Sequence, residues 1–358
     1  MADRIMMKGN EAIAEGAIRA GCRFFFGYPI TPQNEIPEYM SKRMPEVGGT
    51  FIQAESEVSA INMVYGAAGA GARAMTSSSS PGVSLKMEGI SYIAGAELPC
   101  VIVNVSRGGP GLGGLTPSQA DYFQATKGGG HGDYRLVVFA PSSVQEIIDL
   151  MYEAFVTADK YRTPAMVLAD GLLGQMMEPV TLTAVSDLQI PSKPWATTGQ
   201  APGKPLSLIN SLGLLGEELE RINIRIQQKY QEIEAHEIRF AEEDVATADL
   251  IVVAYGTSAR VAKSALAKAK AQGKKVGLFR PITLWPFPAQ RLSELAKAGK
   301  RFLVVEMSAG QMVEDVKLAA AAGSQSSVDF FGKLNGGIPT VNEVLDAILK
   351  NFENKGVA

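Results

Sequence analysis

Three short segments of the chain carry residue types that together suit a site for a small carboxylate and a heteroaromatic cofactor. They are Gly27–Pro32 (Gly-Tyr-Pro-Ile-Thr-Pro), Gln53–Glu57 (Gln-Ala-Glu-Ser-Glu) and Asn104–Arg107 (Asn-Val-Ser-Arg). Each follows a short apolar run of the kind that forms a buried strand. Loops at the ends of parallel strands converge on one crevice of an open α/β sheet. The sequence therefore predicts that a hydroxyl, a carboxylate and a guanidinium meet in one place.

Glu57 is the candidate acid–base group. Val58, Ala60 and Ile61 flank it, which predicts a largely dry environment. Burial disfavours the charged form of a carboxyl group. Such a group can share a proton with a ring nitrogen, as thiamine diphosphate requires at N1′ of its aminopyrimidine. The alternative is that Glu55 and Glu57 are only favourable anions at a helix N-terminus.

Thr31 and Arg107 are the candidate groups for binding a carboxylate. Pro32 restricts Thr31 to extended backbone angles, which fixes the direction of its hydroxyl. Alone, Thr31 is better explained as a cap of the helix that follows. Arg107 follows an apolar strand and can bind a carboxylate through two parallel hydrogen bonds. Alone, it is as well explained by an ordinary ion pair.

The glycine-rich run Gly108–Gly114 contains the spacing Gly-x-Gly-x-x-Gly, and Asp133 follows at a distance suited to a ribose contact. A dinucleotide site needs a helix that opens within such glycines. Pro110 and Pro117 prevent this, so we expect a flexible loop beside the substrate instead.

Two further polar segments have open roles. The hydroxyls and free amides of Thr76–Gly82 can face a ligand, or they can simply cap a helix. His131 lies in a glycine-rich loop, where it can act as an acid–base group or be a solvated side chain without a catalytic role.

Composition bounds the class of protein. The chain has 358 residues, 46% of them hydrophobic and 20% charged, with a net charge of −3. These values are typical of a soluble globular protein of two domains and exclude a large basic face for nucleic acid. Cys22 and Cys100 lie in apolar runs, which predicts buried, unreactive thiols. Two cysteines cannot hold a four-iron cluster, and no metal site is predicted.

The sequence predicts a cytoplasmic protein without a membrane span. No apolar stretch reaches the roughly 20 residues that cross a bilayer. The start of the chain lacks the apolar core and cleavage pattern of a signal peptide, and low cysteine usage fits a reducing compartment.

Residues 8–170 alternate between strand-like and helix-like segments. This alternation predicts βαβ units and a mostly parallel sheet covered on both faces. We expect strands at 23–26, 50–52, 72–77, 99–105, 136–139 and 165–169. We expect helices at 9–20, 33–44, 55–69, 81–95 and 142–158, the last capped by Ser142 or Ser143.

Three domains or segments are predicted: 1–178, 179–245 and 246–358. Prolines across 171–206 indicate an extended linker. Apolar residues then recur at helical spacing from Leu212 to Ile233, which predicts one amphipathic helix of roughly 30 residues, about 45 Å long, acting as a packing strut. A second α/β unit follows, with strands at 249–255, 275–279 and 302–305 and helices at 260–271 and 341–352.

These motifs resemble the α subunit of the 2-oxoacid:ferredoxin oxidoreductases, and most closely the 2-ketoisovalerate (3-methyl-2-oxobutanoate) type. Gly27–Pro32 is the most specific motif, and Gln53–Gly66, Ile93–Pro99 and Asn104–Arg107 follow in the family's order. The resemblance covers nearly the whole chain. It implies a doubly wound parallel sheet of the thiamine-diphosphate-binding, pyrimidine type, followed by a transketolase C-terminal-like α/β domain.

The resemblance also assigns roles to residues. Thr31 and Arg107 are expected to hold the substrate carboxylate, and Glu57, which matches the family's glutamate better than Glu55, is expected to contact the aminopyrimidine. These three are the expected catalytic residues. The other motif residues expected beside the cofactor are Tyr28, Pro29 and Ile30.

The chain carries one half of a thiamine diphosphate site. Thiamine enzymes hold the diphosphate and Mg²⁺ with Gly-Asp-Gly and an asparagine some way further on. The nearest approach here is Ala169–Gly171, with no asparagine before Asn210. We therefore expect a β subunit to supply the diphosphate half with Mg²⁺. We expect iron–sulfur clusters on a ferredoxin-like subunit and other partners, a γ-type subunit among them.

The implied reaction is oxidative decarboxylation of a 2-oxoacid with coenzyme A, giving acyl-CoA, CO₂ and electrons for ferredoxin. A second hypothesis keeps the fold but uses 2-oxoglutarate, whose second carboxylate needs an additional cation. The Gly108–Gly114 loop has none, which favours an apolar substrate side chain. A scaffold subunit with a vestigial site is a third hypothesis, and an NAD-dependent dehydrogenase is a fourth.

Overall fold

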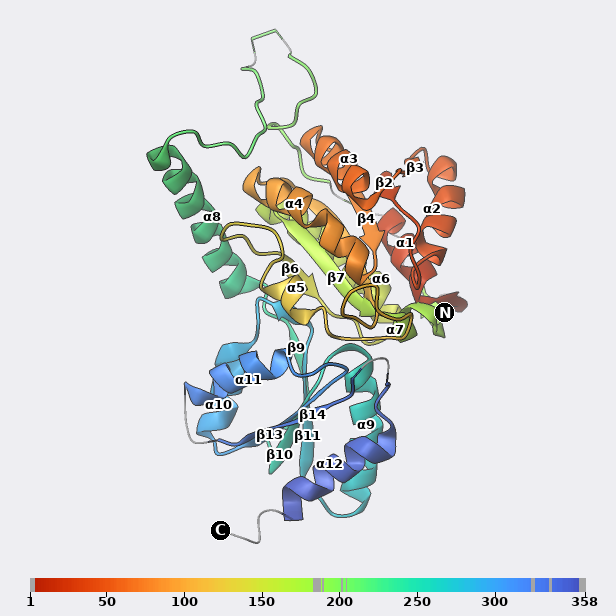
Figure 1. Ribbon diagram of the computed structural model, residues 1–358, viewed down its shortest axis with the longest axis vertical. Coiled ribbons are helices and arrows are strands. Elements are labelled where there is room, and N and C mark those ends of the chain that lie inside the picture. The colour runs from red at the N-terminus through yellow and green to blue at the C-terminus, as the bar shows by residue number, and fades with distance from the viewer. Residues whose placement is uncertain are drawn as a thin grey trace.

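The computed structural model describes residues 4–182, 188, 190–200, 202–203, 205–322, 326–334 and 337–353. The first three residues of the chain, the end of the predicted third domain and parts of the predicted linker lie outside the described residues. The chain forms two lobes, one above the other in Figure 1, each built on its own sheet.

The first lobe contains a seven-stranded sheet in the order β12-β6-β7-β5-β4-β2-β3. All neighbours are parallel except β12 and β6, so the predicted mostly parallel sheet is confirmed. Its strands are β2 (Phe24–Gly27), β3 (Thr50–Gln53), β4 (Ala74–Ser78), β5 (Cys100–Ser106), β6 (Val137–Phe139), β7 (Pro164–Asp170) and β12 (Thr283–Trp285).

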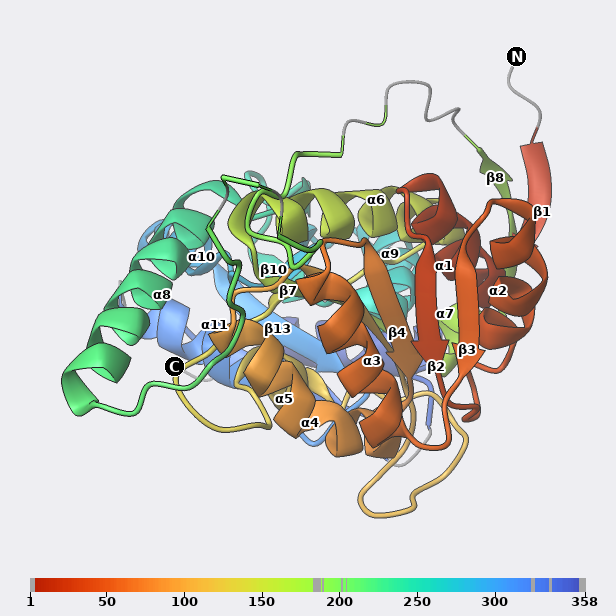
Figure 2. The same cartoon turned by 90° about the horizontal axis from the view of Figure 1, so that it is seen from above.

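Helices cover both faces of this sheet, α1, α2 and α6 on one side and α3 and α4 on the other (Figure 2). The first-lobe helices are α1 (Gly9–Arg19), α2 (Glu35–Glu46), α3 (Glu57–Gly69), α4 (Ser80–Gly95), α5 (Tyr122–Thr126), α6 (Val144–Tyr161) and α7 (Gly171–Gln175). Every residue of β5 and β7 is buried, as expected for strands covered on both faces.

Two local predictions are confirmed. Ser143 caps α6, because its hydroxyl accepts a hydrogen bond from the backbone N–H of Glu146 at 3.1 Å. Cys22 and Cys100 are buried free thiols, and burial raises the pKa of each to about 12. Neither thiol is therefore a nucleophile near neutral pH.

The second lobe has a five-stranded sheet in the order β14-β13-β10-β11-β9, with β9 antiparallel to its neighbour. Its elements are β9 (Phe240–Glu243), β10 (Leu250–Val253), α9 (Gly256–Ala271), β11 (Val276–Pro281), α10 (Ala289–Lys297), β13 (Arg301–Glu306), α11 (Met312–Ala321), β14 (Val328–Gly332) and α12 (Val341–Glu353). Leu250 and Val252 face the core beneath α9 and α12, whereas Ile251 and Val253 face the core that continues into the first lobe. The alternation of side chains along β10 thus joins the two lobes.

Several elements are not predicted by the sequence pattern, because they are short or half exposed. The most consequential is β12, which leaves the second lobe and pairs antiparallel with β6 in the first sheet. The others are β9, α10, α11, β14 and β1 (Arg4–Lys8), which pairs antiparallel with β8 (Met177–Thr181).

The prediction for residues 171–242 is partly wrong. The linker does not begin at 171, because α7 and then β8 occupy 171–181. The long helix, α8, spans Gly216–His236, 21 residues rather than about 30. Gly213 and Gly216 disfavour a helix across 212–215. α8 packs along the first lobe (Figure 1), and its Tyr230 ring meets the Trp285 ring of β12 at 5.4 Å. Within the described residues no helix has the length and apolar character of a membrane span.

Candidate functional site

The three predicted segments lie together at the carboxyl edge of the first sheet. Gly27 and Gln53 are paired at the ends of β2 and β3, and the N–H of Ala54 donates to the carbonyl of Gly27 at 2.9 Å. Ser78 and Asn104 are paired near the ends of β4 and β5. The parallel register of four strands therefore brings the segments to one edge.

Arg107 is a buried guanidinium without an acidic partner among the described residues. It is 7% exposed, and its Nη1 and Nη2 donate to the carbonyl oxygens of Thr31 at 2.9 Å and Leu112 at 3.1 Å. Its Nε has no partner. The alternative of an ordinary ion pair is not met, and a buried cation without a counter-charge is costly. The arrangement suits an anionic ligand.

A network that the sequence analysis missed holds Arg107 in place. The hydroxyl of Ser80 accepts from the N–H of Arg107 at 2.9 Å and lies 2.6 Å from a carboxylate oxygen of Asp121. Asn104 donates to the same oxygen at 2.9 Å and accepts from the N–H of Ser80 at 3.1 Å. Ser79 is the N-cap of α4 but makes no side-chain cap, so simple capping does not explain these hydroxyls.

Thr31 is not a helix cap. The N-cap of α2 is Asn34, whose amide donates to the hydroxyl of Thr31 at 3.3 Å. Thr31 is half buried, and its carbonyl is the group that meets Arg107. The structure thus brings these two predicted residues into contact. The neighbouring motif residues line the outer edge of the crevice: Tyr28 and Pro29 are exposed and Ile30 is half buried.

Glu57 is the first residue of α3 and is only 7% exposed. The preceding residue, Ser56, is the N-cap of this helix, and its hydroxyl accepts a hydrogen bond from the N–H of Ser59 at 3.2 Å. Among the described residues the Glu57 carboxylate accepts no hydrogen bond. The predicted burial of Glu57 is confirmed, and Ala60 and Ile61 are buried with it, whereas Val58 is 43% exposed because the next helical position points outward. Glu55 is exposed and accepts from the hydroxyl of Ser59 at 3.1 Å.

Buried polar atoms without partners gather at this edge. Within the part of the chain that the structure describes, the hydroxyls of Ser78, Ser79 and Ser106 and the Nε of Arg107 have no hydrogen-bond partner. A Cβ on Gly82 would lie 2.7 Å from Oε1 of Glu57, so only glycine allows α4 to approach this carboxylate so closely. Unsatisfied donors beside a free carboxylate fit the polar edge of an aminopyrimidine and a 2-oxoacid.

The diphosphate half of such a site has no counterpart in these residues. The Asp170 carboxylate caps α7 through the N–H groups of Leu172 and Leu173, and burial raises its pKa. No group of acidic, histidine or cysteine side chains suited to a metal ion occurs in the described part of the chain.

Residues 108–121 form a closed loop that projects from the carboxyl edge (Figure 2). The N–H of Gly108 donates to the carbonyl of Thr116 at 2.9 Å, and Gly114 donates back to Gly108 at 2.8 Å. No helix opens among these glycines, and α5 begins only at Tyr122. The geometry required by a dinucleotide fingerprint is not formed in this loop. His131 is exposed in the next loop.

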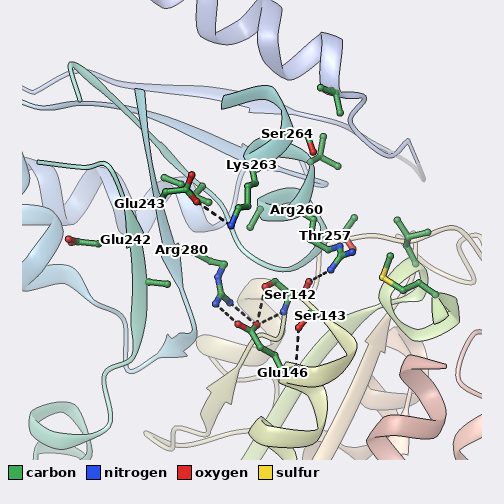
Figure 3. Close-up of a pocket in the computed structure, with 17 residues that line it drawn as sticks. Ser142, Ser143, Glu146, Glu242, Glu243, Thr257, Arg260, Lys263, Ser264 and Arg280 are labelled. Atoms are coloured by element: carbon green, nitrogen blue, oxygen red, sulfur yellow. Dashed lines mark hydrogen bonds and ion pairs between the residues drawn. The ribbon is translucent and has the colours of Figure 1, made fainter. Parts of the chain in front are cut away.

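A cleft of about 760 Å³ lies between the lobes, away from the predicted residues (Figure 3). Its three cations are paired: Arg280 with Glu146 at 2.6 Å, Arg260 with Glu178 at 2.6 Å and Lys263 with Glu243 at 3.3 Å. Arg280 reaches both carboxylate oxygens of Glu146, which joins β11 to α6. The Arg280–Glu146 ion pair at this cleft therefore connects the two lobes.

Replacing Arg280 with methionine is expected to lower the free energy of unfolding by about 1–3 kcal/mol, because two charge-assisted hydrogen bonds are lost from a nearly buried side chain. Chemical denaturation measures this loss. Lys263→Met, which removes a lysine whose side chain is 68% exposed, is the matched control and should leave stability within error. Equal stabilities for the two variants would contradict a stabilising role for the Arg280–Glu146 ion pair.

Fold and site together define a thiamine-diphosphate-binding α/β protein of the pyrimidine type with a second α/β lobe. The family model for pyruvate flavodoxin/ferredoxin oxidoreductase, thiamine diphosphate-binding, matches residues 15–239. That for pyruvate:ferredoxin oxidoreductase core domain II matches residues 248–344. The chain belongs to this family, the 2-oxoacid:ferredoxin oxidoreductases.

Relatives agree with this assignment. The ketoisovalerate oxidoreductase subunit VorB of Methanothermobacter thermautotrophicus is 52% identical over 96% of each chain. The 2-oxoglutarate synthase subunit KorA of the same organism is 37% identical over 98% of this chain and 99% of that relative.

Solved structures show the same fold. The 2-oxoglutarate:ferredoxin oxidoreductase of Magnetococcus marinus, solved with 2-oxoglutarate, coenzyme A and succinyl-CoA, superposes with a TM-score of 0.87 at 27% identity over 98% of this chain. This chain spans 65% of that chain. A split-gene transketolase, at 14% identity and a TM-score of 0.62, shares the fold alone.

Proposed function

We propose that the chain is the α subunit of a complex that oxidatively decarboxylates a branched-chain 2-oxoacid, 2-ketoisovalerate, with coenzyme A as acyl acceptor and ferredoxin as electron acceptor. The observation that carries the proposal is the edge where Arg107, a buried cation without an acidic partner among the described residues, meets Thr31 near the free carboxylate of Glu57. The 52% identity to a chain named as a ketoisovalerate oxidoreductase subunit supports the substrate class.

Each residue has a defined task in this proposal. Arg107 and the hydroxyl of Thr31 hold the carboxylate of the 2-oxoacid and orient its keto carbon. Glu57 holds or releases a proton at N1′ of the aminopyrimidine. When bound, thiamine diphosphate supplies the carbanion chemistry, and the protein supplies orientation and electrostatics. Tyr28, Pro29 and Ile30 form the outer edge against which the cofactor lies.

The α3–α4 face favours a partner subunit that completes the cofactor site. Large apolar side chains are exposed around Glu57: Ile52, Val58, Met63, Leu85 and Tyr92. Exposed apolar surface of this kind is typical of protein interfaces. We propose that a β subunit covers this face and brings the diphosphate-binding half with Mg²⁺. A ferredoxin-like subunit and further partners, including a γ-type subunit, would carry the iron–sulfur clusters, in a reducing cytoplasm suited to two free thiols.

An apolar substrate side chain is favoured over 2-oxoglutarate by the loop beside Arg107. Residues 108–116 contain no cation that could pair with a second carboxylate. The KorA relatives named for 2-oxoglutarate are less similar, at 30–38% identity.

Anaerobic co-purification of the chain from its native cell tests the proposal. We expect partner chains, thiamine diphosphate and iron in one fraction, with coenzyme A-dependent viologen reduction that is faster with 2-ketoisovalerate than with 2-oxoglutarate. Faster turnover of 2-oxoglutarate would overturn the substrate assignment. A lone chain without thiamine, iron or turnover would overturn the function and leave the fold.

A further inference from the structure

Lys86 is a fully buried lysine with no surface role. It lies on α4 with none of its surface exposed, and its ammonium donates to the hydroxyl of Thr76 at 3.0 Å. An ammonium has three donors, and burial of a charge is costly unless the charge is compensated. Met87, the next residue, shows that this helix also accommodates an unbranched apolar side chain.

Two layers of side chains place Lys86 beneath Glu57. Ser78 and Thr76 project from the same side of β4, since side chains alternate along a strand. In the upper layer, Gly82 packs against Ser78 and the Glu57 carboxylate. In the lower layer, one helical turn on from Gly82, Lys86 contacts Thr76. Helical side chains lean toward the N-terminus of their helix, so the Lys86 ammonium extends toward the Glu57 layer.

The charge of Glu57 acts on Lys86. Burial lowers the pKa of Lys86 to about 8, and Glu57 is the charged group that opposes this shift. Because the folded-state pKa lies below the ordinary value of 10.5, the folded chain binds fewer protons than the unfolded chain between about pH 8 and pH 10.5. Stability therefore rises with pH across that window. The ammonium costs folding stability at neutral pH, so stability alone does not explain it.

We propose that Lys86 is a positioning residue for Glu57, whose negative charge its buried ammonium compensates and whose carboxylate it directs toward the aminopyrimidine edge. This inference rests on the proposed function of Glu57. The carboxylate accepts no hydrogen bond among the described residues, and Lys86 is the one basic residue of α4, with its charge acting on Glu57. Lys86 needs no contact with substrate, because it acts through the charge of Glu57.

The test uses the complete complex carrying Lys86→Met, a change that removes the charge and keeps the unbranched shape. We expect a 10- to 100-fold lower kcat, weaker binding of thiamine diphosphate to the cofactor-depleted complex, and loss of the near-ultraviolet circular dichroism of the imino tautomer. The wild-type rate should decline as pH rises past about 8, where the ammonium is lost. This decline should be absent from the variant. Its thermal midpoint should equal or exceed that of the wild type.

Two further variants keep the test decisive if Lys86→Met does not assemble. Thr76→Val removes the acceptor of the ammonium and should move the decline in rate to lower pH, whereas Thr76→Ser retains the hydroxyl and should keep the wild-type pH profile. Lys263→Met, at an exposed lysine, is the charge control. Unchanged cofactor affinity, dichroism and pH profile in Lys86→Met, or a lower thermal midpoint alone, would overturn the positioning role. A wild-type complex that binds no thiamine diphosphate would instead overturn the proposed function.

Discussion

Replacing Glu57 with glutamine is expected to lower the kcat of the assembled complex by about 10²- to 10⁴-fold, the range typical of a lost acid–base group. Glutamine keeps the size and buried position of Glu57 but cannot exchange a proton with N1′. The amount of complex and its subunit ratio should not change, because the carboxylate makes no hydrogen bond within the described chain. Steady-state turnover with 2-ketoisovalerate measures kcat, and size-exclusion chromatography measures the amount and subunit ratio of the complex.

Glu55→Gln is the matched control for this experiment. Glu55 lies two residues earlier, is exposed, and accepts a hydrogen bond from the hydroxyl of Ser59. Loss of the Glu55 carboxylate should leave kcat within about twofold of the wild type, as is usual for surface changes. Wild-type turnover in the Glu57→Gln complex would favour the scaffold hypothesis, in which the pyrimidine half-site is vestigial.

Replacing Arg107 with methionine is expected to raise the KM for the 2-oxoacid by about 10- to 100-fold. The reason is that hydrogen bonds to a charged group contribute about 1.5–3 kcal/mol each, and about 1.4 kcal/mol is a tenfold change in affinity. Arg107→Lys should recover only part of the lost substrate affinity, since a lysine keeps the charge but lacks the planar guanidinium that forms two parallel hydrogen bonds. Initial rates across a range of 2-ketoisovalerate concentrations give KM and kcat separately.

The control for Arg107 must separate substrate binding from support of the loop, because Nη2 also donates to the carbonyl of Leu112. Leu112→Ala removes a side chain that is 85% exposed while keeping that carbonyl. Its KM should remain that of the wild type. If KM rises equally in both variants, Arg107 acts by shaping the loop and not by binding the carboxylate.

A double variant tests whether Lys86 acts through Glu57. The effects of Glu57→Gln and Lys86→Met should not add, since Lys86 is proposed to act through the charge of Glu57. A double variant should therefore be about as slow as Glu57→Gln alone. Additive losses would indicate that the two residues act independently.

Much of the first lobe follows from local sequence. Strands such as β5 are apolar over most of their length, so their burial on both faces, and hence a parallel sheet, can be predicted. The order of Thr31, Glu57 and Arg107 after successive strands predicts their meeting, because parallel strands place their carboxyl ends at one edge. The lack of a Gly-Asp-Gly motif and the two cysteines likewise predict the need for partners.

Contacts between distant residues decided the rest. The pairing of β12 with β6 joins residues far apart in sequence, and three residues carry too weak a pattern to predict it. The lack of an acidic partner for Arg107 among the described residues could be known only once the neighbouring side chains were placed.

The sequence by itself determined the class of fold and the order of the candidate site segments, and it predicts only one half of a cofactor site. These properties depend on residue types and on spacing along the chain. The tertiary structure alone decided that Lys86 is buried against Thr76, that Ser80 and Asp121 hold the backbone of Arg107, and that β12 joins the sheet of the first lobe. Burial and charge compensation arise between layers of side chains that meet only in the folded chain, and local patterns do not encode them.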